Sequence, residues 1–143
     1  MSTRRRAREL ACQILYQIDL SRETPERAFA VFWQNFECEP QARGFAEELV
    51  RGVWGEHETV DGLIADSAEH WRLGRIAKVD LCILRVATFE LLRCAEVPVS
   101  VVINEAVEIA KRFGTDDSPG FVNGVLDRVA AGLGRKGEDG REV

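Results

Sequence analysis

The sequence predicts an all-α protein, a compact bundle of about seven helices. In most segments, apolar residues recur at the 3.6-residue spacing of an amphipathic helix. No segment shows the clean alternation of apolar and polar residues that marks a half-buried strand. A chain of 143 residues fits one core, and we expect two helical sub-bundles packed around a central buried helix.

The first four helices have recognisable starts. The first runs from about Arg4 to Leu20, with an apolar arc along one side. The second begins at Thr24-Pro25 and the third at Pro40, because proline suits the first helical position. The fourth follows Gly55, and its apolar set extends to Trp71.

The fifth helix, from about Arg75 to Cys94, is predicted to be the central one. Its apolar residues cover almost the whole circumference, and a helix that is apolar on all sides is buried on all sides. Arg85 and Glu90 lie within it. A buried charge must be paired or hydrogen-bonded, so we expect both side chains to have partners.

The last two helices are predicted from turn residues. Pro98 ends the preceding segment, Ser100 is suited to cap the sixth helix, and Gly114 is suited to the left-handed position after it. The last helix is expected to start at Asp117-Ser118-Pro119.

The predicted domain covers residues 1–134, and residues 135–143 are expected to form a disordered, charged tail because they contain almost no apolar residues. No uncharged apolar run approaches the ~18 residues of a membrane span. The four cysteines are widely spaced, without the pairs typical of zinc sites. We therefore expect reduced cysteines, no metal, no cofactor and a cytoplasmic location.

Charge is distributed unevenly along the chain. The net charge is −5, yet residues 1–8 hold four arginines and no acid, so the remainder has 15 basic and 24 acidic residues. A basic tip can hold nucleic acid locally, while an acidic body repels it or binds a basic partner.

The first helix suggests a contact surface for single-stranded nucleic acid. At 100° per residue, Arg5, Arg8, Cys12 and Tyr16 fall on one strip that we expect to be exposed. Arginines in a first turn oppose the helix dipole at a cost of roughly 0.3–1 kcal/mol each. Guanidinium groups suit phosphates and an aromatic ring suits a base. The alternative is a frayed, solvated basic end.

Phe121 occupies an unusual place on the last helix. It lies about 100° from the centre of the apolar arc, beside Gly124 and Arg128. This position suggests a contact surface, although an aromatic side chain that tucks under a neighbouring helix is the more common arrangement.

Four separated blocks resemble a known family. They are RRRARExAxQxLYQ at the start, LxRIAxVDxxILRxAxxELL in the middle, and INEAxxxAKxxG and FVNGVLD near the end. Together, from about Arg4 to Leu133, they resemble the NusB family of transcription antitermination factors. The resemblance implies binding of boxA-type single-stranded RNA together with ribosomal protein NusE, within the RNA polymerase antitermination complex that supports ribosomal RNA transcription.

The resemblance also implies which residues make contact. RNA-binding residues are expected to be Arg4, Arg5, Arg6, Arg8, Tyr16, Asp117 and Phe121. Asp80 matches an acid that lies toward the NusE surface in the family; by itself it would be interpreted as a solvated acid at an edge.

We expect no enzymatic activity, because the chain lacks the GxSxG, HExxH, Walker and GxGxxG motifs. DNA reading is disfavoured, since the last helix has few cations before the tail. The alternative function is a helical homo-oligomeric interaction module without an RNA role. A homodimer is also compatible with the resemblance, because some family members dimerise.

Overall fold

The computed structural model of the protein describes residues 2–68 and 72–135. This part of the chain contains seven α-helices, one 3-10 helix and no strand, so the predicted all-α fold is confirmed. The elements are α1 (Thr3–Ser21), α2 (Pro25–Asn35), α3 (Pro40–Gly55), α4 (His57–Ser67), η1 (Leu73–Arg75), α5 (Lys78–Arg93), α6 (Val99–Phe113) and α7 (Ser118–Gly132).

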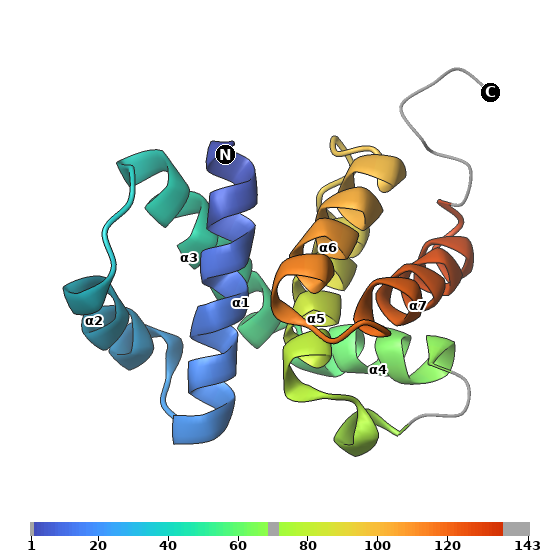
Figure 1. Cartoon of the computed structure of the whole chain (residues 1–143), viewed down its shortest axis with the longest axis horizontal. Helices are drawn as coiled ribbons and strands as arrows, with labels where there is room; N and C mark the ends of the chain where they lie inside the picture. The colour runs from blue at the N-terminus through green and yellow to red at the C-terminus, as the bar shows by residue number, and fades with distance from the viewer. Residues whose placement is uncertain (1, 69–71, 136–143) are drawn as a thin grey trace.

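The helices form two lobes (Figure 1). The first lobe consists of α1, α2 and α3, and the second of α4, α5, α6 and α7. Helix α5 packs against α1 and α3 of the first lobe as well as against α4, α6 and α7. The prediction of two sub-bundles around a central helix is therefore confirmed, and one continuous core spans both lobes.

The predicted starts of the early helices agree with the structure. Pro25 and Pro40 are the first residues of α2 and α3, and the Thr24 hydroxyl accepts a hydrogen bond from the Arg27 backbone N–H. The Ser2 hydroxyl caps α1 in the same way, by accepting from the backbone N–H of Arg5 at 3.1 Å. These caps satisfy donors that have no partner within the helix.

Two predicted helix starts in the second lobe are wrong, and Gly114, which follows α6 as predicted, lacks the predicted left-handed conformation. Helix α5 begins at Lys78, because Arg75 belongs to η1. Helix α6 begins at Val99, after an extended Pro98 whose carbonyl accepts from the Val102 N–H, so Ser100 lies inside the first turn. Gly114 is extended, at φ −93° and ψ −164°.

The predicted start of α7 is confirmed in position, because the helix begins at Ser118 with Pro119 in its first turn. Asp117 occupies the position before the helix but has helical backbone angles and no capping hydrogen bond. The Ser118 hydroxyl accepts from the Thr115 backbone N–H at 2.9 Å, a bond within the α6–α7 turn that does not cap the helix. A Cβ atom on Gly114 would collide with this hydroxyl. The glycine is therefore needed for close approach and not for a left-handed turn.

The predicted partners of the two charges in α5 are present. Arg85 donates to Asp61 at 2.9 and 3.0 Å and to Asp19 at 3.0 Å. Glu90, only 1% exposed, accepts two hydrogen bonds from Arg8, each at 2.8 Å.

The folded part of the chain extends one residue past the predicted boundary at 134. Arg135 donates to the backbone carbonyls of Leu91 at 2.7 Å and Val97 at 2.9 Å, so it holds the end of the chain against the α5–α6 connection. The rest of the predicted tail, and Trp71 of the fourth apolar set, lie outside the described residues. None of the described helices is long and apolar enough to cross a membrane.

Candidate functional site

The arginines of α1 do not form the exposed strip that we predicted. Arg8 is 4% exposed and Cys12 is 9% exposed, so the prediction is wrong for both residues. The reason is that α5 covers this side of α1, and the buried Glu90 of α5 holds the Arg8 guanidinium. Burial alone would lower the pKa of Arg8, but the hydrogen bonds and charge of Glu90 outweigh it and raise the pKa. Arg8 is therefore a charged residue inside the protein.

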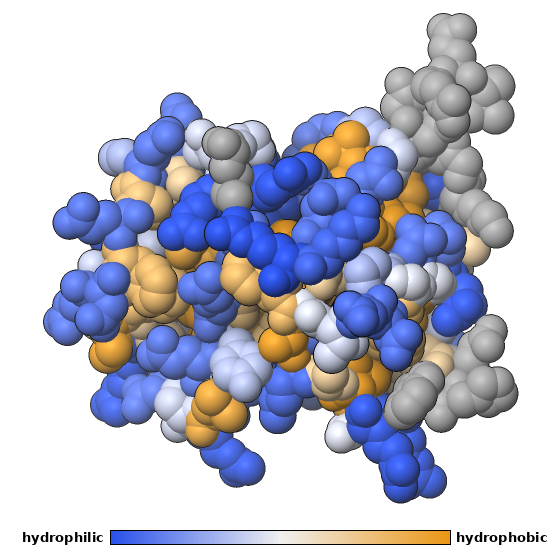
Figure 2. Space-filling view, in the orientation of Figure 1, coloured by the Kyte–Doolittle hydropathy of each residue, from blue (hydrophilic) through white to orange (hydrophobic). Residues whose placement is uncertain are grey.

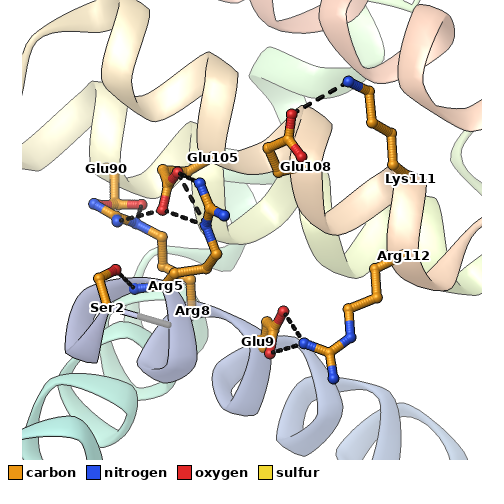
Figure 3. A network of polar contacts seen from close by, with 9 residues as sticks. All are labelled: Ser2, Arg5, Arg8, Glu9, Glu90, Glu105, Glu108, Lys111 and Arg112. Atoms are coloured by element: carbon orange, nitrogen blue, oxygen red, sulfur yellow. Dashed lines mark hydrogen bonds and ion pairs between the residues drawn. The ribbon is translucent and has the colours of Figure 1, made fainter.

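Arg5 lies at the edge of this network, between the two lobes (Figure 3). Its Nη2 lies 2.5 Å from Oε2 of Glu105 on α6, and its Nε lies 3.1 Å from Oε1. Hydrogen bonds from Arg5 lower the pKa of Glu105, and the same contacts raise the pKa of Arg5. Arg8 Nη1 also lies 3.6 Å from Glu105, so one carboxylate serves two arginines.

Arg6 and Arg4 have weaker contacts. Arg6 Nη1 lies 3.7 Å from the buried Glu9, whose closer partner is Arg112 of α6 at 3.0 Å. Arg4 is exposed, and its guanidinium carbon lies 4.1 Å from the centroid of the Phe45 ring of α3. Figure 2 shows strongly hydrophilic residues gathered over the N-terminal half of α1 and toward α6. We call Arg4, Arg5, Arg6 and the buried Arg8 the cationic edge of α1. This edge is the first half of the candidate site.

The second half is a hollow where η1, the start of α5 and the start of α7 meet. It has a volume of about 270 Å³, and its lining includes Asp80, Asp117 and Phe121 together with Arg75 and Ile76. Phe121 is half-buried and packs against the core at the same time. Phe121 thus packs against the core and also lines the hollow, and its role as a contact residue stays a prediction.

Asp80 is more buried than an edge acid would be. It is 8% exposed, and among the residues that the structure describes its buried Oδ1 has no hydrogen-bond partner. An unpaired buried carboxylate oxygen is unfavourable, so Asp80 carries an unsatisfied polar atom next to the hollow that its residue lines. Asp117, by contrast, is exposed at the rim.

Tyr16 borders a different hollow, between α1, α5 and α6. This space of about 230 Å³ is mainly apolar, and Phe113 of α6 lines it along with Val79 of α5. Burial raises the pKa of the Cys12 thiol, and raises the pKa of Cys82 to about 12, so both thiols in its wall are protonated at neutral pH. Because Val79 lines this hollow and Asp80 the other, the start of α5 separates the two.

Sequence reasoning missed several of these residues. Glu105, Arg75 and Phe113 were not predicted as site residues. Phe113 could have been found, because it is a large aromatic residue at the exposed end of α6. The link between Arg5 and Glu105 joins residues 100 positions apart, and no local pattern signals such a pair. The described residues contain no group of three or more side chains suited to hold a metal ion.

The fold and site define a class: a two-lobed, all-helical domain with a cationic edge and an acidic, aromatic hollow. The NusB family model matches residues 5–131. The transcription antitermination protein NusB of Anaeromyxobacter dehalogenans is 52% identical over 140 residues, covering 96% of this chain and 98% of that protein. The chain belongs to the NusB family.

Solved structures of similar proteins support the same conclusion. The NusB structure of T. maritima has a TM-score of 0.79 and 38% identity, covering 92% of this chain and 93% of that one. A chain in the crystal structure of antitermination factors NusB and NusE in complex with dsRNA has a TM-score of 0.80 and 25% identity. That alignment covers 92% of this chain and 98% of that one.

Proposed function

We propose that this protein is a transcription antitermination factor that binds boxA-type single-stranded RNA together with NusE and joins the RNA polymerase antitermination complex. It acts as a binding protein in the cytoplasm, not as an enzyme, and supports ribosomal RNA transcription. The observation that carries the proposal is the hollow shared by Asp80, Asp117 and Phe121.

The shared hollow supports joint binding of two partners. Asp80 is expected to contact the protein partner, whereas Asp117 and Phe121 are expected to contact RNA, and these residues come from two elements far apart in the sequence. Because they line one hollow of about 270 Å³, a protein partner and an RNA strand bound here would touch each other. The bound protein partner would then extend the surface that RNA contacts, and the bound RNA would extend the surface that the protein partner contacts.

The chemistry of the site fits both partners. The ring of Phe121 offers a face for base stacking, which contributes roughly 1–3 kcal/mol per base. The exposed Arg4 and the half-exposed Arg5 offer guanidinium groups for phosphates. A net charge of −5, together with the unpaired oxygen of Asp80, favours a basic protein partner such as a ribosomal protein.

Fluorescence anisotropy with a labelled boxA RNA, with and without NusE, tests the proposal. We expect weak binding alone and a large gain with NusE. Phe121→Ala should weaken RNA binding by roughly 1–3 kcal/mol if a base stacks on the ring. The matched control is Phe36→Ala, because Phe36 is 39% exposed on the other lobe.

Two results would contradict the proposal. The first is an RNA affinity that does not change when NusE is added. The second is equal RNA binding by Phe121→Ala and Phe36→Ala, with only the melting temperature lowered. A duplex of the same sequence, measured in parallel, separates recognition of unpaired bases from general attraction to phosphates.

A further inference from the structure

The cationic edge of α1 is largely neutralised by carboxylates of the second lobe. Arg5 and Arg8 face Glu105 and Glu90, and these four side chains carry no net formal charge (Figure 3). Among the described residues, Arg4 is the one arginine of this edge without a carboxylate partner. A phosphate that approaches α1 therefore meets a neutral cluster where the sequence alone suggests a strongly positive one.

The two carboxylates differ in what RNA can reach. Glu90 and Arg8 are both buried, with side-chain exposures of 1% and 5%, so their contact belongs to the interior. Arg5 and Glu105 meet nearer the surface, where the Arg5 side chain is 38% exposed and the Glu105 side chain 14% exposed. The Arg5–Glu105 contact can therefore open without unfolding the core.

The geometry of this contact is the one that a phosphate would adopt. Glu105 engages the Nε and Nη2 atoms of Arg5 together, and arginine binds phosphate oxygens through the same paired donors. A phosphate on the remaining edge of the guanidinium would still be repelled by the nearby carboxylate, since like charges at short range are unfavourable. Glu105 thus occupies, or shields, the phosphate position on Arg5.

We propose that Glu105 competes with an RNA phosphate for Arg5 and thereby sets the RNA affinity of the protein. This inference rests on the proposed RNA-binding function. In the free protein the carboxylate holds Arg5. When RNA binds, a phosphate displaces Glu105 and the guanidinium turns from one acid to the other. Arg8 loses its 3.6 Å contact with Glu105 in this exchange but keeps its two hydrogen bonds to Glu90.

The test compares Glu105→Gln with Glu108→Gln by RNA anisotropy in the presence of NusE. Glu108 is the matched control, because it lies on the same helix, has 45% side-chain exposure and pairs with Lys111 at 3.2 Å. Both changes remove one negative charge. We expect Glu105→Gln to raise RNA affinity about three- to tenfold over the control, and to steepen the log–log salt dependence by about 0.7.

A second pair of variants links the effect to Arg5. In an Arg5→Ala background, Glu105→Gln should raise the RNA affinity no more than Glu108→Gln does, because the arginine that Glu105 would release is absent. Glu105→Asp keeps the charge but shortens the side chain by one methylene, so its RNA affinity should lie between the wild type and Glu105→Gln. This variant keeps the proposal testable if Glu105→Gln proves unstable.

Two outcomes would overturn the inference. If Glu105→Gln and Glu108→Gln bind RNA equally, only general electrostatics are at work. If Glu105→Gln binds more weakly than the control at unchanged helicity, Glu105 orients Arg5 and does not compete for it. Absence of RNA binding by the wild type with NusE would instead overturn the proposed function, so the two failures are distinguishable.

Discussion

Arg5 and Arg8 lie one helical turn apart in the same arginine-rich segment, yet their surroundings give them different properties. Arg8 is 4% exposed and forms two hydrogen bonds to an equally inaccessible glutamate. Arg5 is half-exposed and faces Glu105, whose side chain is 14% exposed. A basic sequence motif is therefore not one functional unit, because its residues divide between the core and the edge.

Arg8→Ala should lower the free energy of unfolding by about 3–5 kcal/mol, because it leaves Glu90 charged, buried and unpaired. Arg4→Ala, the control, should cost at most about 1 kcal/mol, since it removes only an exposed contact with the Phe45 ring. Urea denaturation followed by circular dichroism measures both. Equal losses for the two variants would show that Glu90 finds another donor or becomes protonated.

The residue scale is where prediction from sequence was least complete. The need of Glu90 for a partner followed from its place in an apolar helix, but the identity of the partner did not, because Arg8 lies 82 positions away. The placement of Phe121 off the apolar arc was useful, since the ring lines a hollow. The assumed exposure of Arg8 and Cys12 failed, because a helical wheel does not show which second helix covers a strip.

At the scale of elements, α3 and α5 approach closely at one point. Gly52 of α3 faces the ring of Phe89 of α5, and a Cβ atom there would lie 2.5 Å from one ring carbon, Cε1. The missing side chain allows the ring to fill the space between two helices of different lobes. This glycine is thus part of the junction between the lobes.

Gly52→Ala should destabilise the protein. Overpacking against Phe89 costs typically 1–3 kcal/mol and outweighs the gain in helix propensity of about 1 kcal/mol. Gly44→Ala, in the same helix but with open space around it, should be neutral or stabilising. The unfolding free energies of the two variants give the comparison. If they gain stability equally, the Phe89 ring moves aside without cost.

Helix starts were predicted better than the two boundaries at either end of α6. Pro25 and Pro40 mark α2 and α3 correctly, because proline restricts its own backbone. Ser100 misled, because several local arrangements can satisfy the free backbone groups of a helix end. Gly114 follows α6 as predicted but for another reason, since it leaves room for the Ser118 hydroxyl that accepts from the Thr115 N–H.

At the scale of the whole molecule, ion pairs between α1 and α6 connect the two lobes. Arg5 donates to Glu105, and Arg112 of α6 donates to Glu9 of α1. The fold class, the two sub-bundles and the central helix could be predicted, because apolar periodicity determines them. These cross-lobe pairs could not, since they depend on how two amphipathic helices are finally placed.

Acid should weaken this connection in a defined pH range. Arg5 lowers the pKa of Glu105 below its ordinary value of 4.5, so the folded state binds its proton less readily than the unfolded state. The stabilisation is complete above the ordinary pKa and is lost as the pH falls below it. The melting temperatures of wild type and Glu105→Gln should therefore differ at pH 7 and converge as the pH falls below 4.5 and through the lowered pKa of Glu105. A difference in melting temperature that stays constant over this pH range would contradict the stabilising role of the Arg5–Glu105 pair.

The Ser2 hydroxyl, which accepts from the Arg5 amide and opens the first helix, has a practical consequence for studying the molecule. A purification handle or fluorophore fused ahead of that serine would add mass and charge beside the very guanidinium groups whose ligands are to be measured. Attachment after Val143, with Arg135 anchoring the chain upstream, leaves the opening turn in its natural form.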